Sequence, residues 1–154
     1  MIQLFVVFSL LLWAISLTGL GCLAGQLIKI YYRDMEITDD YKICYYGILG
    51  FITISVTGTI FNFFIPLGAA FSTIILAGGI ILFFIYRKTI LPSFNRVNIL
   101  IISLLLVYCS VMSLMNMDCY DTGLYHLPMI NWITNSSLPF GLANLHDRFG
   151  FNNS

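Results

Sequence analysis

The chain has 154 residues, of which 59% are hydrophobic and only 9% are charged, and its formal net charge is zero. Soluble domains carry about 25% charged residues, and a folded chain of this size still exposes much of its surface. The composition therefore excludes an ordinary water-soluble domain and predicts an all-α integral membrane protein in contact with the lipid bilayer. Without a net positive charge or a basic patch, nucleic acid is excluded as a partner.

Four apolar runs are long enough for membrane-spanning helices, each of which needs about 20 mostly apolar residues. In chain order they cover residues 4–28, 43–65, 67–86 and 97–115. The first run has no basic residue ahead of it and is longer than the roughly 7–15 apolar residues of a signal peptide, so we expect it to be retained as a spanning helix. Pro66 lacks a backbone N–H and separates the second run from the third, which predicts a tight helical hairpin.

The distribution of basic residues predicts the topology. Six of the seven Lys and Arg residues flank the first and third loops between the runs: Lys29, Arg33, Lys42, Arg87, Lys88 and Arg96. Because basic residues favour the cytoplasmic side, we expect both loops in the cytoplasm and both termini outside. The predicted domains are a four-helix transmembrane region over residues 1–115 and an extracytoplasmic juxtamembrane segment over residues 116–154.

The apolar runs contain small residues but little polar chemistry. Gly21 and Gly25 form a GxxxG spacing, which allows close helix packing within the chain or between two copies. No ionisable Asp, Glu, Lys, Arg or His lies in the middle of a run, which argues against a self-contained pump or transporter. Asn62 is expected to form hydrogen bonds near the hairpin turn. Asp39 and Asp40, in the first loop, are either part of a solvated connector or ligands of a cation.

A polar segment follows the last run, and it includes the stretch YDTGLYHLPMINW at residues 120–132. Asp121 is expected to cap a short helix that runs to about Thr134, in which Pro128 either introduces a kink or begins a new helix. The aromatic residues favour an amphipathic helix at the outer membrane surface, with a further extracytoplasmic loop after it. From the residues alone, Asp121 is either a cap without chemistry or a carboxylate that acts as a general base or binds a divalent cation.

Two stretches of this segment resemble a known family. The first, DTGLYHLPMINW, resembles the Asp-x-x-x-Tyr-His-x-Pro…Trp signature of bacterial multi-spanning membrane proteins of the GT-C glycosyltransferase type. The second, PFGLANLHDRFGFNNS, resembles the continuation in an uncharacterised branch of these proteins. The positions that match are Asp121, Tyr125, His126, Pro128, Asn144, Leu145, His146 and Arg148. Two residues depart from the pattern: Asp147 stands where glycine is more usual, and Asp118 has no counterpart.

The resemblance implies a glycosyltransferase of the bacterial cytoplasmic membrane that moves a sugar from a polyprenyl-phosphate donor to a glycan acceptor on the extracytoplasmic side. Asp121, Tyr125 and His126 would form the catalytic site, with Asp121 as the base. His146 or Arg148 would contact the donor phosphate. No protein metal site is predicted, and a divalent cation, Mg²⁺ or Mn²⁺, is the candidate cofactor.

The length differs from that of GT-C enzymes, which usually have several hundred residues. The resemblance therefore implies that these 154 residues are the N-terminal part of a larger enzyme and are inactive alone. Two other functions stay open. One is a non-enzymatic membrane scaffold or interaction module, which the small size and the uncharged spans favour. The other is a component of polysaccharide polymerisation or export.

Overall fold

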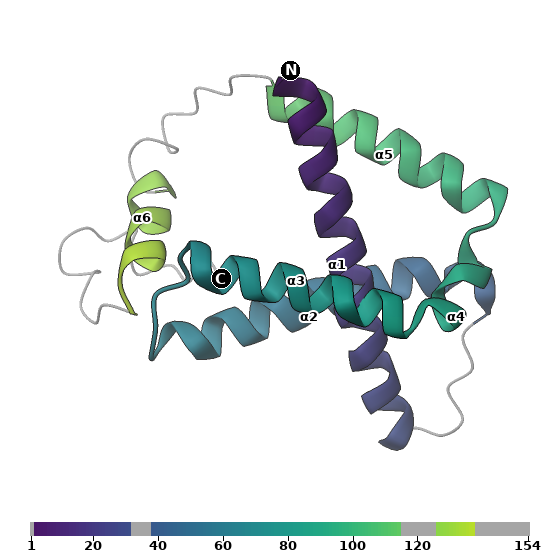
Figure 1. Ribbon diagram of the computed structural model, residues 1–154, viewed down its shortest axis with the longest axis horizontal. Coiled ribbons are helices and arrows are strands. Elements are labelled where there is room, and N and C mark those ends of the chain that lie inside the picture. The colour runs from purple at the N-terminus through teal and green to yellow at the C-terminus, as the bar shows by residue number, and fades with distance from the viewer. Residues whose placement is uncertain (1, 32–37, 115–125, 138–154) are drawn as a thin grey trace. The chain divides into compact units, whose positions relative to one another are not determined.

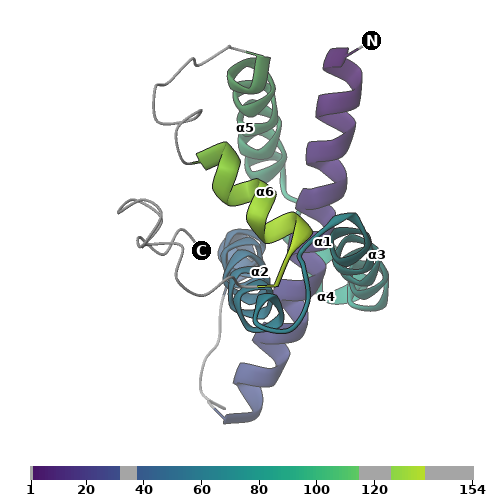
Figure 2. The ribbon, with the colours of Figure 1, turned by 90° about the vertical axis from the view of Figure 1, so that its left-hand side faces the viewer.

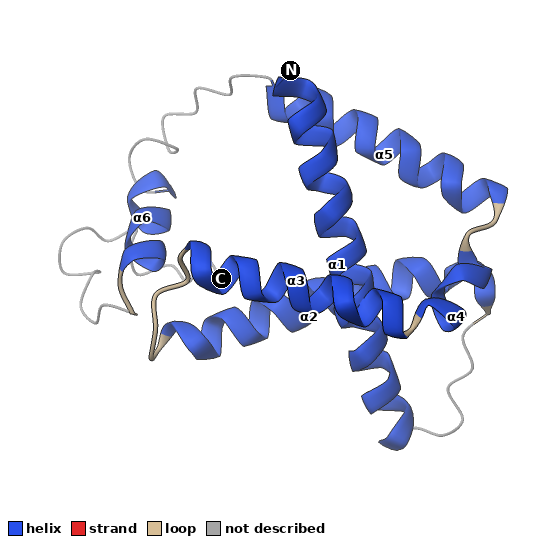
Figure 3. Cartoon of the chain, viewed as in Figure 1, coloured by secondary structure: helices blue, strands red, loops and turns tan. Residues whose placement is uncertain are grey.

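The computed structural model describes residues 2–31, 38–114 and 126–137, and each of its elements is helical (Figures 1 and 3). No strand occurs in these three ranges, which confirms the all-α prediction. The elements are α1 (Ile2–Tyr31), α2 (Asp39–Asn62), α3 (Ala69–Ile85), α4 (Arg87–Ile90), the 3₁₀ helix η1 (Leu91–Ser93), α5 (Arg96–Leu114) and α6 (Leu127–Asn135).

Two helices are long and apolar enough to cross a membrane, namely α1 over Phe5–Tyr31 and α2 over its whole length. A third candidate is formed by α3 together with α4 and η1, which meet at a bend of 71°. The apolar part of α5, Arg96–Met112, is shorter, and residues 115–125, which follow α5, lie outside the described ranges. The helices indicate a membrane protein with two candidate spans in the described residues, or three if the bent pair is one span; the four expected spans are not confirmed.

The chain divides into two compact units. Unit 1 contains Met1–Ile54 and Ile75–Asn116, and unit 2 contains Ser55–Ile74 and Met117–Ser154. The division crosses α2 and α3. The tip of the α2–α3 hairpin belongs to unit 2 because it makes contacts with the segment of α6.

In unit 1, α1 passes between α2 and α3 and packs closely against both (Figure 2). A methyl group on Gly21 would overlap the backbone carbonyl of Tyr46 in α2, and one on Gly19 would overlap that of Gly79 in α3. Residues 19 and 21 lie about 200° apart around the helix axis, so the glycines open two opposite faces of α1. The GxxxG spacing thus serves packing within the chain at Gly21.

In unit 2, a connection of six residues, 63–68, joins the end of α2 to the start of α3. It begins with turns in which the N–H groups of Phe64 and Ile65 both donate to the carbonyl oxygen of Phe61, at 2.9 Å each. The Phe61 and Phe71 rings pack with their centroids 5.9 Å apart. This is the hairpin that Pro66 predicted, although α2 ends at Asn62 and not at residue 65.

Candidate functional site

The residues predicted for catalysis fall mostly outside the described ranges. His126 is described and immediately precedes α6. Asp121, Tyr125, His146 and Arg148 lie outside the described residues, so the geometry of the predicted site, including any contact among them, is not part of this structure.

The structure describes α6 from Leu127, with His126 directly before it. Asp121, the expected cap, lies outside the described residues. Pro128 lies within the first two positions of α6, which a proline tolerates because the amide it lacks has no partner inside the helix there. In α6 as the structure describes it, Pro128 therefore stands at a position that accepts proline. The end of α6, at Asn135, lies one residue beyond the expected end at Thr134.

The C-terminal end of α6 is attached to the α2–α3 connection. The N–H of Leu67 donates to the carbonyl oxygen of Ile133 at 2.8 Å. The side-chain amide of Asn62 lies 3.4 Å from the carbonyl oxygens of Ile133 and Ser136, and 3.4 Å from that of Ile65. Since the last carbonyls of a helix have no partner within it, these donors satisfy groups that would otherwise need water.

The attachment is close as well as polar. Asn62 is only 5% exposed, so its amide is shielded from competing water. An added Cβ on Gly68 would lie 2.9 Å from the carbonyl oxygen of Thr134, nearer than real Cβ atoms come to other atoms. Asn62 was expected to bond near the turn; its bonds to α6, 71 and 74 residues away, were not expected.

The outer surface of α6 carries large exposed apolar side chains, those of Leu127, Ile130 and Trp132. Tryptophan favours the boundary between headgroups and hydrocarbon. The helix therefore has the composition expected of a segment lying in a membrane surface, although α6 is only nine residues long.

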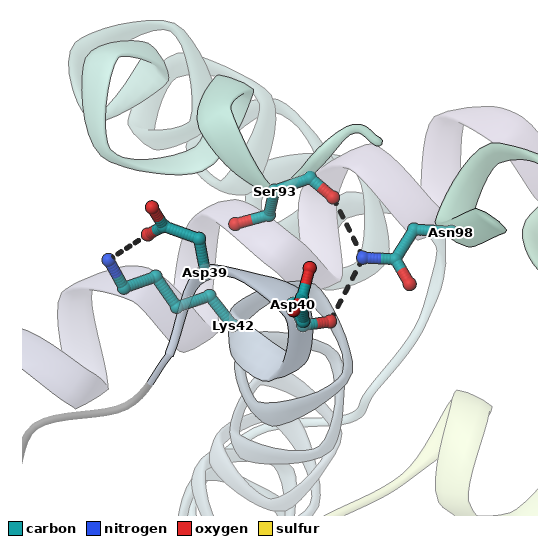
Figure 4. A network of polar contacts seen from close by, with 5 residues as sticks. All are labelled: Asp39, Asp40, Lys42, Ser93 and Asn98. Carbon is teal, nitrogen blue, oxygen red and sulfur yellow. Dashed lines mark hydrogen bonds and ion pairs between the residues drawn. The ribbon is translucent and has the colours of Figure 1, made fainter. Parts of the chain in front are cut away.

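A second polar group lies in unit 1, where the start of α2 meets the segment leading into α5 (Figure 4). This loop-side cluster comprises Asp39, Asp40, Lys42, Ser93, Asn95 and Asn98. The side-chain amide of Asn98 donates to the carbonyl oxygens of Asp40, at 2.9 Å, and Ser93, at 2.8 Å. The backbone of α2 is thereby tied to that of η1.

The other members of the loop-side cluster are paired too. The amide of Asn95 donates to a carboxylate oxygen of Asp40 at 2.8 Å. Its side-chain oxygen accepts from the N–H of Asn98 at 2.8 Å, which caps the start of α5. Asp39 forms an ion pair with Lys42. Both acids thus have protein partners, and within the described ranges no three His, Cys, Asp or Glu side chains could hold a metal ion together.

Sequence reasoning missed the role of the asparagines in this cluster. The signal was present, because Asn95 stands two residues before the apolar run at 97–115 and Asn98 follows three residues further on, the spacing at which a cap side chain reaches a free helix amide. What the spacing could not show is the partner of Asn98, since the backbone of Asp40 lies 58 residues away.

The comparisons with known proteins identify a family. The whole chain, residues 1–154, matches the family described as "Domain of unknown function (DUF8201)", and the chain therefore belongs to it. No curated protein and no solved structure matches the chain.

Proposed function

We propose that this DUF8201 protein acts in the bacterial cytoplasmic membrane and contributes to transfer of a sugar from a polyprenyl-phosphate donor to a glycan acceptor on the extracytoplasmic side. The observation that supports the proposal is the attachment of α6 to the hairpin turn. The motif from Asp121 to His126 runs directly into α6. A helix held at the end of a membrane hairpin is a position from which a side chain can reach both a lipid-linked donor and an aqueous acceptor.

The proposal includes four membrane crossings with both termini outside. α1 and α2 are the first two, α3 with α4 and η1 forms a bent third, and α5 is the fourth. The loop-side cluster supports this arrangement, because Asn98 ties the start of α2, which follows the first loop, to Ser93, the last residue of η1, where the bent third crossing ends and the third loop begins. Two loops joined by hydrogen bonds belong on one side of the membrane, and their basic residues favour the cytoplasm.

In the proposed reaction, the carboxylate of Asp121 takes the proton of an acceptor hydroxyl. The acceptor oxygen then forms a bond to the anomeric carbon, the bond from that carbon to the donor phosphate oxygen breaks, and polyprenyl phosphate leaves. Arg148 or His146 stabilises the negative charge of the departing phosphate, for which the forked donors of an arginine are well suited. Tyr125 and His126 complete the site beside the base, and Mg²⁺ or Mn²⁺ is the candidate cofactor.

The experiment compares Asp121→Asn, Asp121→Ala and the matched control Asp118→Asn in the protein as its gene encodes it. The readout is transfer of labelled sugar from the polyprenyl-phosphate donor in isolated membranes. Loss of a general base lowers rates by about a hundredfold or more, so we expect that loss for both Asp121 variants and near-normal transfer for Asp118→Asn.

Other outcomes would assign a different function. Normal transfer by well-expressed Asp121→Asn, with a strong loss in Asp121→Ala, would make Asp121 a structural residue, because asparagine replaces aspartate well as a cap. If deleting the gene leaves transfer intact but disrupts polysaccharide export, the export component is the better description. If deletion changes neither but disperses a membrane complex, the protein is a scaffold.

A further inference from the structure

Unit 1 contains an apolar cavity of about 490 Å³ between α1 and α2. Its walls include Ala14 and Thr18 of α1 and Gly47 of α2, and Phe83 and Ile102 contribute from α3 and α5. The volume lies in the range of roughly 300–1,000 Å³ that is typical of ligand pockets. We propose that this cavity holds one acyl chain of an anionic membrane phospholipid, whose headgroup lies beside the loop-side cluster.

The lining selects hydrocarbon over water. Apart from backbone atoms, the only polar groups on the wall are the hydroxyl of Thr18 and the thiol of Cys44. The hydroxyl of Thr18 already donates to the carbonyl oxygen of Ala14 at 2.8 Å, one turn away in the same helix. A buried water usually needs two to four polar partners, which these groups do not supply, whereas apolar surface is covered favourably by a hydrocarbon chain.

The cavity opens towards lipid. Leu11, Ile48 and Phe51 belong to its lining and are also exposed, so its rim is an apolar surface on α1 and α2. These are the two helices long and apolar enough to cross a membrane. In a bilayer, the molecules that meet such a rim are lipids, and an acyl chain can enter sideways without crossing a polar surface.

Gly47 provides part of the space. A Cβ built at Gly47 would meet no atom within 4 Å, whereas one at Gly50, a turn further along α2, would overlap the carbonyl of Leu17. The two glycines therefore do different things. Gly50 lets α1 approach, and Gly47 keeps the wall of the cavity open.

Charge at one end of the cavity favours an anionic headgroup. The lining residues Ile43 and Phe94 directly adjoin Lys42 and Asn95 of the loop-side cluster. Arg96 follows Asn95 directly, so two cationic residues, Lys42 and Arg96, lie within two residues of this part of the lining. Clustered Lys and Arg beside a spanning helix attract anionic lipid headgroups. This inference stands without the proposed glycosyl transfer.

The test uses the full-length protein in nanodiscs that contain phosphatidylglycerol with a photoreactive diazirine on one acyl chain. After illumination, the labelled peptides are identified by mass spectrometry, and we expect label on the cavity-lining segments of α1 and α2. Gly47→Leu fills the cavity, and displacing roughly two methylene groups of a bound chain should lower labelling about tenfold. The matched control is Gly78→Leu, because Gly78 also has open space around it but does not line the cavity.

Equal labelling of the wild type and Gly47→Leu would overturn the proposal. If Gly47→Leu does not fold, as judged by circular dichroism and gel filtration, Ala14→Leu fills the cavity from α1 and takes its place. Equal labelling by phosphatidylcholine with the same diazirine chain would overturn the preference for an anionic lipid. The last outcome concerns competition between unlabelled lipids. If polyprenyl phosphate lowers the labelling at a lower concentration than unlabelled phosphatidylglycerol does, the cavity binds the isoprenoid chain, and the proposal of a phospholipid acyl chain is overturned.

Discussion

The packing of α1 in unit 1 and the attachment of α6 in unit 2 are built in opposite ways. Gly21 and Gly50 let α1 and α2 meet backbone to backbone. This contact therefore depends on the lack of a side chain at both positions. The attachment of α6 depends on donors that are present, the N–H of Leu67 and the amide of Asn62. One interface is disrupted by adding a methyl group, and the other by removing an amide.

The difference follows from the surroundings expected for each interface. Between helices in lipid the hydrophobic effect does not favour association, because acyl chains are as apolar as the side chains. The helices associate instead through close van der Waals packing, which small residues allow. At the hairpin turn the last carbonyls of α6 need donors, since an unpaired buried polar backbone group is costly. The predictions below test whether the two interfaces respond differently to matched substitutions, beginning with the largest expected effect.

Gly50→Ala should cause the largest loss. Its new methyl group would overlap the backbone of Leu17, which cannot move aside as a side chain can, so we expect about 3 kcal/mol less stability, at the upper end for overpacked sites. The measurement is the midpoint of thermal unfolding in detergent. Gly47→Ala, with open space around it, is the control and should be neutral or slightly stabilising. Equal losses in the two variants would contradict the backbone contact.

Asn98→Ala should cost somewhat less, about 2 kcal/mol, because it leaves the carbonyl groups of Asp40 and Ser93 without their donor in a site where Asn98 is only 8% exposed. The same thermal assay measures it. Asn95→Ala removes a half-buried cap and should cost about 1 kcal/mol. A loss for Asn95→Ala that matches or exceeds that of Asn98→Ala would show that burial does not decide the strength of this cluster.

Asn62→Ala should have a smaller effect, near 1 kcal/mol, since its contacts of 3.4 Å are long for hydrogen bonds. We expect amide hydrogen exchange in α6 and at Leu67 to accelerate about fivefold. The control, Asn131→Ala, changes an exposed asparagine whose side-chain oxygen accepts from the amide of Asn135 within α6, and it should leave exchange at Leu67 unchanged. Unaltered exchange in Asn62→Ala would mean that Leu67 alone holds α6.

Lys42→Ala should have the smallest effect. It removes the ion pair with Asp39, a carboxylate that is 58% exposed, and exposed pairs contribute roughly 0–1 kcal/mol. We expect the unfolding midpoint to move by less than a degree or two, with no dependence on added salt. A larger, salt-sensitive shift would reveal that this pair contributes more to the loop-side cluster than its exposure implies.

The apolar runs predicted where the helices lie, and they predicted it well. Hydropathy marks which residues avoid water, but it does not mark where a helix ends, so residues 63–65 were assigned to a helix although α2 ends at Asn62. The helices over Arg87–Ser93 were read as part of a loop, because a short segment with two basic residues and a proline has no apolar periodicity. The expected start of the last helix, at Asp121, lies outside the described ranges.

The partners across the fold could not be predicted in the same way. The GxxxG spacing indicated that Gly21 lies at a helix contact, but the choice of Tyr46 and Gly50 as neighbours depends on how α1 crosses α2. Likewise, the polarity of Asn62 indicated a hydrogen bond, while its bond to Ile133 depends on a contact between segments 71 residues apart. The motif residues Asp121 and Tyr125 lie outside the described ranges, and their roles stay predictions.

The most direct test of the central claim, that α6 and its motif lie outside a membrane crossed four times, is a set of reporter fusions to the encoded protein. Alkaline phosphatase, active only outside the cytoplasm, and a green fluorescent protein that folds only inside are joined after Thr38, Pro66, Ser93 and Asn135. The account predicts the order inside, outside, inside, outside, because the basic residues around the first and third loops favour the cytoplasm. A fusion after Ser93 that reads outside, or one after Asn135 that reads inside, would contradict it.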